Sequence, residues 1–161
     1  MIRAAAPSDF EDIARCIHAA FQSELEVDLV QQLRADQDAL LDLVAEREAS
    51  IVGHVMVSKL ALHPDVGLRC GGVAPLSVTP GHQGMGIGAA LMNEVMLRSR
   101  AADLDALFLL GEPAYYQRFG FRVTEVESDY PAAYFQAFEL TPQCLHGRKT
   151  KAVYARAFAA L

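Results

Sequence analysis

Apolar residues recur at helical spacing over two stretches near the start of the chain. They fall three or four positions apart over residues 10–21 and again over residues 25–33, as on the buried face of a helix. Ser8 and Glu11 precede the apolar face of the first stretch in the Ser-x-x-Glu pattern of a capping box. We therefore expect two consecutive amphipathic helices, the first of them capped by Ser8.

Shorter apolar runs, separated by polar or glycine-containing segments, predict β-strands. The polar tripeptide 47–49 is short enough to join two of them in a hairpin. The run 106–110 is apolar at every position, as expected of a strand buried on both faces. The predicted strands are residues 2–5, 40–46, 50–60, 71–78, 106–110, 121–126, 134–140 and 151–158.

The middle of the chain reads as a strand–helix–strand unit. The helix that carries Ile87, Leu91 and Val95 on one face lies between strands 71–78 and 106–110. Such a unit joins two parallel strands through a right-handed crossover. We expect strands 71–78 and 106–110 to be parallel.

The last part of the chain predicts a short helix and a final hairpin. Pro113 suits the first turn of a helix over 113–119, and Gly120 suits its end. Strands 134–140 and 151–158 are expected to pair with each other in antiparallel fashion. Because the chain contains no internal repeat and no linker, we expect residues 1–161 to form one domain.

The segment Leu76–Met92 organises the rest, because it runs from an apolar strand through a glycine-rich turn into a helix. Pro80 has no N–H group and ends the strand. Glycines then leave bare backbone N–H groups at the start of the helix, where the helix dipole adds partial positive charge. The loop is therefore suited to bind an anion, and a phosphate group above all.

The glycine pattern of this loop also has three other interpretations. For a short glycine pattern alone, a tight turn that binds nothing is as common as a loop that binds a ligand. A phosphate-binding P-loop is excluded, because no Gly-Lys-Ser or Gly-Lys-Thr follows. A dinucleotide fingerprint is nearly matched by Gly84, Gly86 and Ala89, with Asp103 or Asp105 about 20 residues on. However, Asp105 precedes its strand rather than closing it, and only one strand–helix–strand unit is present.

Composition narrows the choice of partner and compartment. The 161 residues carry a net charge of -6, which argues against a broad nucleic-acid or membrane-binding surface. Three widely spaced cysteines favour reduced thiols over a disulfide framework. No two of the five histidines stand at ligand spacing, so we expect no metal. With no signal-peptide pattern and no apolar run that could span a bilayer, a cytoplasmic location is expected.

The glycine-rich loop fits one family pattern better than these alternatives. Residues 83–88 match the Gln/Arg-x-x-Gly-x-Gly/Ala signature for acetyl-coenzyme A, with strand residues 76–78 directly before it. Together with the segment 110–121, they make the chain resemble a bacterial branch of the GNAT superfamily of N-acetyltransferases. The resemblance spans nearly the whole chain and is most specific over residues 71–121. It implies an α/β (α+β) fold whose mixed, mostly antiparallel sheet has helices on both faces and a parallel strand pair that splays apart.

The resemblance also implies how the cofactor is held. The diphosphate of coenzyme A would lie on the main-chain amides of the loop, and its pantetheine arm would pair with the freed edge of strand 71–78. The backbone of Val78 would contact pantetheine, and the N–H of Leu76 would stabilise the oxyanion at the thioester. The implied cofactor-binding residues are Leu76, Ser77, Val78, Gln83, Gly84, Met85, Gly86, Ile87, Gly88, Ala89 and Tyr116.

Tyr116 stands four residues before Gly120, where the superfamily often keeps a tyrosine. In that context its hydroxyl would protonate the leaving thiolate; spacing alone favours a buried core tyrosine instead. The adjacent Tyr115 is the weaker candidate, because two neighbours on a helix point in different directions. Many members of the superfamily carry an Asn that contacts the cofactor before this helix, and this chain has Glu112 in that region instead.

A general base is not evident from the pattern. Glu112, Glu24 and Glu26 are candidates by position, although a solvated surface carboxylate is the more common role for each. The catalytic candidates are therefore Tyr116, Leu76 and Glu112. A water chain could also carry the proton from the amine.

The sequence thus predicts transfer of an acetyl group from acetyl-coenzyme A to a primary amine, a small molecule or a peptide, in a ternary complex. Two alternatives stay open: a non-catalytic acyl-coenzyme A sensor, and a dinucleotide-binding oxidoreductase. The first two helices and the final hairpin are expected to wall the acceptor site. No pattern bears on oligomeric state, for which a homodimer is one alternative.

Overall fold

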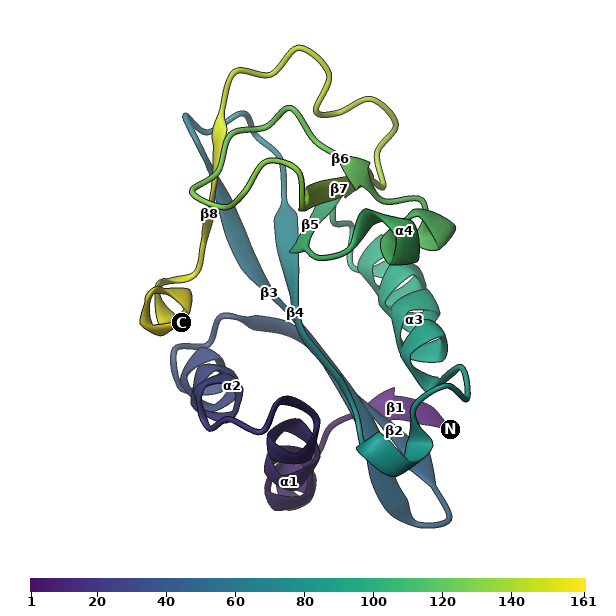
Figure 1. Ribbon diagram of the computed structural model, residues 1–161. Coiled ribbons are helices and arrows are strands. Elements are labelled where there is room, and N and C mark those ends of the chain that lie inside the picture. The colour runs from purple at the N-terminus through teal and green to yellow at the C-terminus, as the bar shows by residue number, and fades with distance from the viewer.

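A computed structural model describes all 161 residues and shows one eight-stranded sheet (Figure 1). The strands follow the order β1-β2-β3-β4-β5-β7-β6, and β8 pairs with β3 off this path. The strands are β1 (Ile2–Ala4), β2 (Ala39–Arg47), β3 (Ser50–His63), β4 (Cys70–Val78), β5 (Ala106–Leu110), β6 (Arg122–Val123), β7 (Phe135–Glu139) and β8 (Lys151–Tyr154).

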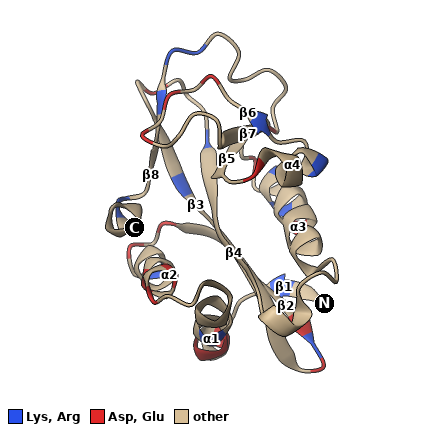
Figure 2. Cartoon of the chain, in the orientation of Figure 1, with Lys and Arg blue, Asp and Glu red and all other residues tan.

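Four helices accompany the sheet. They are α1 (Phe10–Phe21), α2 (Leu25–Ala35), α3 (Ile87–Ala101) and α4 (Pro113–Tyr116). Short 3₁₀ turns add Pro7–Asp9, Pro80–His82, Gln117–Phe119 and Arg156–Ala160. None of the helices is long and apolar enough to cross a membrane. Lys and Arg are dispersed among Asp and Glu over the elements, so no element carries a continuous basic stripe (Figure 2).

Three clusters of buried apolar side chains pack against the two faces of the sheet, because successive side chains of a strand point to opposite faces. Leu43 and Val55 face α3, where they pack with Leu91. Their neighbours Val44 and Met56 face α1 and α2. The helices therefore cover both faces, as the resemblance implied, and α3 and the α1–α2 pair lie on different sides of the strands (Figure 1).

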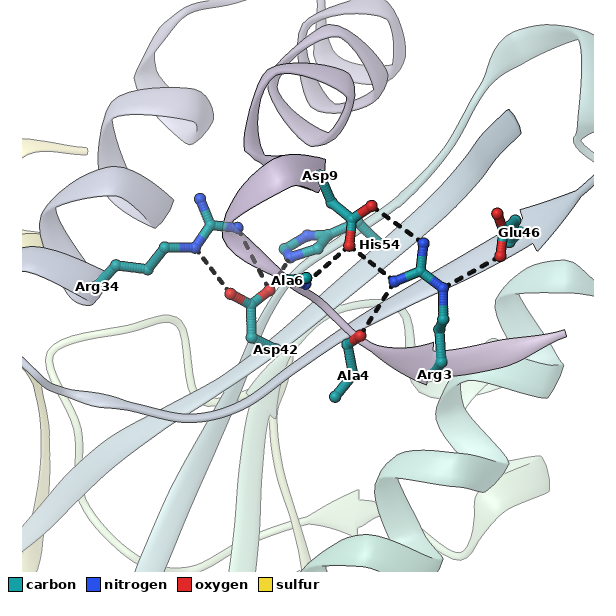
Figure 3. Close-up of polar contacts among 8 residues, drawn as sticks. All are labelled: Arg3, Ala4, Ala6, Asp9, Arg34, Asp42, Glu46 and His54. Atoms are coloured by element: carbon teal, nitrogen blue, oxygen red, sulfur yellow. Dashed lines mark hydrogen bonds and ion pairs between the residues drawn. The ribbon is translucent and has the colours of Figure 1, made fainter. Parts of the chain in front are cut away.

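Two ionic clusters tie the N-terminal elements to the sheet (Figure 3). Arg3 on β1 binds the carboxylate of Asp9 at 2.7 Å and that of Glu46 on β2 at 3.1 Å. In the second cluster, Asp42 on β2 accepts from Arg34 of α2 at 2.7 Å and contacts Nε2 of the fully buried His54 at 2.7 Å. Burial lowers the pKa of His54 despite this carboxylate, which favours a neutral imidazole.

Most predicted elements are confirmed, and the parallel pairing of β4 with β5 is among them. The capping box at Ser8 is wrong. A 3₁₀ turn precedes α1, which begins at Phe10, and it is the Asp9 carboxylate that accepts the Ala6 N–H at 2.7 Å. Asp9 wins because Arg3 also holds its carboxylate in place.

The final hairpin is also wrong. β7 pairs with β5 and β6, whereas β8 pairs with the end of β3. The expected strand 151–158 ends at Tyr154 and gives way to a 3₁₀ turn, and strand 121–126 shortens to Arg122–Val123. An apolar strand pattern identifies a strand but not its partner, and here the 140–150 segment carries the chain from one side of the sheet to the other (Figure 1).

Candidate functional site

The parallel strands β4 and β5 separate soon after they begin. They pair only at Cys70–Ala106, Gly71–Leu107 and Gly72–Phe108. Beyond Phe108, β5 continues along β7 alone, with Leu109 opposite Gln136 and Leu110 opposite Phe135. The side of β4 that faced β5 is therefore free of any strand from Val73 to Val78, which is the splay that the resemblance implied.

The free edge of β4 presents main-chain groups at Leu76 and Val78. The N–H of Thr79 donates to the carbonyl of Val52 on β3 at 2.9 Å. Because main-chain groups alternate in direction along an antiparallel strand, those of Leu76 and Val78 point away from β3, toward the gap. The Val78 carbonyl already accepts from Nε2 of Gln83 at 3.0 Å, which leaves the two N–H groups as the free donors of this edge. Ser77 points its buried side chain out of the sheet plane, and its hydroxyl has no partner.

The loop after β4 carries a series of unpartnered donors. Gln83 N–H makes only a long 3.5 Å contact with the Pro80 carbonyl, and no backbone N–H from Gly84 to Ala89 donates within the chain. Gly84 and Gly86 have φ values of 77° and 81°, in the left-handed region that favours glycine. These turns lead directly into the 15-residue helix α3, whose first N–H groups have no acceptor within the chain. The arrangement suits an anion with several oxygens, because donors and helix dipole act on it together.

Two further contacts brace this loop. Nδ1 of His82 lies 3.1 Å from the Thr79 hydroxyl. Nη1 of Arg47, from the β2–β3 hairpin, lies 3.4 Å from Sδ of Met85. The first contact ties the loop to the end of β4 and the second ties it to the end of β2, and both leave the backbone donors of the loop free.

Tyr116 lies at the end of β5, on the far side of the gap from β4. Its ring covers Gly111, where a methyl group on Cα would lie 2.5 Å from the ring. It also packs edge-on against Phe121 at 6.3 Å between ring centroids. The hydroxyl makes no hydrogen bond within the chain. Burial raises the pKa of Tyr116, which keeps the phenol protonated and able to donate.

Tyr115 turns the other way. Its ring meets that of Tyr116 at 86° with centroids 4.9 Å apart. Its hydroxyl oxygen would lie 3.2 Å from a methyl group built on Gly88, in the first turn of α3. The sequence made Tyr115 a weaker candidate than Tyr116 for the proton donor. The only indication of its position was that two adjacent tyrosines on one helical turn must face different groups.

The three candidate carboxylates differ in their surroundings. Glu112 is exposed and caps α4, accepting weakly from the Ala114 N–H at 3.4 Å. Glu24 pairs with Nδ1 of His18 at 2.5 Å on the surface. Oε2 of Glu26 is buried without a partner. None of these contacts involves the gap between β4 and β5.

A cluster of aromatic side chains lies against Gly72, which with Phe108 forms the last residue pair that joins β4 to β5. A methyl group on Gly72 would lie 2.5 Å from the ring of Tyr154, which comes from β8. Tyr154 meets Tyr130 at 5.3 Å and Phe158 at 4.8 Å between ring centroids. Burial raises the pKa of the Tyr154 phenol. Sequence reasoning missed this group, because no local pattern shows that β8 returns beside β3 and reaches Gly72.

No group of three or more His, Cys, Asp and Glu side chains is arranged to hold a metal ion. A sheet with one split parallel pair, and a loop of free N–H groups that leads from the split into a helix, is the arrangement expected of the acyl-transferring domains that the sequence resembles. The model of the family described as Acetyltransferase (GNAT) domain matches residues 1–124. The chain belongs to this family of acetyltransferases.

Particular relatives agree with that membership. The chain is 34% identical over 130 residues to the uncharacterized N-acetyltransferase YjhQ of Escherichia coli K12, covering 79% of this chain and 72% of YjhQ. It is 31% identical over 153 residues to the uncharacterized N-acetyltransferase YhbS of the same strain, covering 91% of each.

Two solved structures extend the comparison to the fold. The E. coli YhbS structure in complex with CoA is similar at a TM-score of 0.92 and 29% identity, over 99% of this chain and 91% of that one. A GNAT family acetyltransferase from Brucella melitensis in complex with acetyl-CoA gives a TM-score of 0.85 and 32% identity, over 98% of this chain and 97% of that one.

Proposed function

We propose that this chain transfers an acetyl group from acetyl-coenzyme A to a primary amine by direct attack in a ternary complex. The observation that carries the proposal is the pairing of two features: a strand edge left free after Gly72, and unpartnered N–H groups from Gly84 to Ala89 at its end. Two similar structures were solved with CoA or acetyl-CoA, which supports the choice of cofactor.

The cofactor fits the donors that this chain offers. The amides of the loop from Gln83 to Ala89, with Met85 and Ile87 among them, would hold the diphosphate. The N–H groups of Leu76 and Val78 would bind the extended pantetheine arm as a sheet edge binds a peptide. Because fixed backbone donors need no reorganisation, the Leu76 N–H is suited to stabilise negative charge on the thioester oxygen.

The chemical step requires two proton movements. As the amine nitrogen bonds to the carbonyl carbon and the carbon–sulfur bond breaks, the thiolate needs a proton and the amine must lose one. Tyr116 would donate the first, because its phenol is protonated, free of internal hydrogen bonds and located where β5 ends. Water or one of the carboxylates Glu112, Glu24 and Glu26 would accept the second.

The test is release of free thiol from acetyl-coenzyme A in the presence of an amine panel. The panel should contain aliphatic, aromatic and polycationic amines, amino acids and short peptides. The proposal expects thiol release that depends on at least one amine and is matched by an acetylated product. Binding of coenzyme A without turnover on any amine would contradict the enzymatic assignment and leave a sensor. Binding of NAD without coenzyme A would contradict the cofactor assignment as well.

A further inference from the structure

Tyr115 reaches across the open end of the split, from α4 to the first turn of α3. Its hydroxyl oxygen would lie 3.2 Å from a methyl group on Gly88, a distance that an ordinary side chain there could keep only if Tyr115 moved. The same added methyl group would lie 3.8 Å from Cγ2 of Val78, at the end of β4. The phenol therefore stands where the strand edge and the anion-binding loop meet.

The hydroxyl of Tyr115 is free to bind a ligand. It takes part in no hydrogen bond within the chain, and the side chain is only half-buried. A phenol packed among rings but without a partner has an unused donor close to the unpartnered N–H of Gly88.

Arg118 adds positive charge at the same place. Its guanidinium carbon lies 4.6 Å from the centroid of the Tyr115 ring, within the range of a cation–π contact. The contact restricts the ring and brings a cation to the same turn. An acidic oxygen near the Tyr115 hydroxyl would thus meet a neutral donor, a backbone donor and a nearby cation.

We propose that Tyr115 is a positioning residue for the cofactor, whose hydroxyl donates a hydrogen bond to the diphosphate held by the Gly84–Ala89 amides. This inference rests on the proposed function. It divides the work of the adjacent tyrosines: Tyr115 holds the diphosphate end of coenzyme A, and Tyr116 supplies a proton at the thiol end. It also explains Gly88, because a larger residue there would press on the Tyr115 hydroxyl.

The test compares Tyr115→Phe with wild type by calorimetric titration of coenzyme A and by phosphorus NMR of its bound diphosphate. Loss of one hydrogen bond to a charged group should weaken binding by about tenfold. The diphosphate resonances of the bound cofactor should shift between the two proteins. Turnover should show a raised KM for acetyl-coenzyme A with kcat nearly unchanged, whereas Tyr116→Phe should lower kcat.

Tyr134→Phe is the matched control, since Tyr134 is 48% exposed and its side chain has no part in the proposed site. The inference is overturned if Tyr115→Phe binds coenzyme A as tightly as wild type. It is also overturned if binding weakens while the diphosphate resonances stay in place, which would assign the hydroxyl to another part of the cofactor. Failure of wild type to bind coenzyme A would instead refute the proposed function.

Discussion

Adjacent residues with the same side chain face different surroundings on α4. Tyr116 packs inward over Gly111, and Tyr115 reaches Gly88 on the other side of the split. Both rings share the T-shaped contact between them, so neither hydroxyl can take the other's place without repacking. This separation allows a distinct prediction for each.

Tyr116→Phe should lower kcat by about 100-fold or more, the size usual for loss of a general acid, with little change in KM for acetyl-coenzyme A. Phe keeps the contacts with Phe121 and Gly111, so the fold should survive. Steady-state kinetics with an accepted amine measures the effect. A variant that retains full kcat would remove Tyr116 from the mechanism.

Asp9 should make the protein sensitive to acid. The hydrogen bond from Arg3, helped by the Ala6 N–H, lowers the pKa of Asp9 to about 2. A lowered folded-state pKa stabilises the protein above the unfolded pKa of about 4, and this stabilisation is lost as pH falls toward 2.

The free energy of unfolding should fall less steeply with falling pH in Asp9→Asn than in wild type. Denaturant titrations between about pH 6 and about pH 2, in steps of about one pH unit, measure this. Glu11→Gln is the control, because Glu11 is exposed and forms no ion pair. Parallel pH profiles for wild type and Asp9→Asn would contradict the prediction.

At this scale the sequence predicted residue types better than their partners. The glycines of the loop followed from local spacing, whereas the choice of Tyr116 as the candidate acid came from the family resemblance. The predicted cap at Ser8 was wrong because Arg3 holds the Asp9 carboxylate in place. The direction of the Tyr115 side chain could not be predicted, because it depends on where α3 lies relative to α4.

The split between β4 and β5 is a property of whole elements. Its last rung, Gly72–Phe108, is covered by Tyr154 of β8, which would be only 2.5 Å from a methyl group on Gly72. The rung thus depends on a glycine in one strand and an aromatic residue in another.

Gly72→Ala should destabilise the fold by about 1–3 kcal/mol, the usual cost of overpacking a tight site. Gly81→Ala is the matched control, because nothing lies within 4 Å of a methyl group there. Equal free energies of unfolding for the two variants would show that Tyr154 does not restrict this rung.

The loop before α3 offers a second element-level test with a closely matched control. Gly86 and Gly67 have φ values of 81° and 77°, and a methyl group would have open space at each. Alanine at either position should cost about 1 kcal/mol of stability through the left-handed backbone. Only Gly86→Ala should also weaken coenzyme A binding, as measured by calorimetry, because only that residue sets the direction of the loop amides. Equal affinities for the two variants would argue against the loop as the binding site.

Element types were predictable here, and long-range pairing was not. The strand–helix–strand unit from 70 to 110 follows from local apolar patterns and from the handedness of crossovers. The partners of β7 and β8 do not, because each strand found a different edge of the sheet at large sequence separation. The expected wall of the acceptor site changes with this pairing, because β8 reaches the split through Tyr154 rather than through a terminal hairpin.

The whole molecule is one sheet with clusters of buried apolar side chains on both faces, and the split opens between β4 and β5. A ligand bound in the split would contact β4, α3 and α4 together and so favour the folded state. Coenzyme A should therefore raise the melting temperature in proportion to the logarithm of its concentration once sites are saturated. Differential scanning fluorimetry over a range of coenzyme A concentrations checks this, and no shift at high concentration would contradict it.

The central claim is that free main-chain donors of β4 and of the following loop hold coenzyme A. Backbone amide NMR during titration with coenzyme A tests it most directly. The account predicts saturable shifts at Leu76, Val78 and the amides from Gly84 to Ala89, with residues of β1 and β8 unaffected. Binding that leaves these amides unchanged, or shifts centred elsewhere on the sheet, would contradict it.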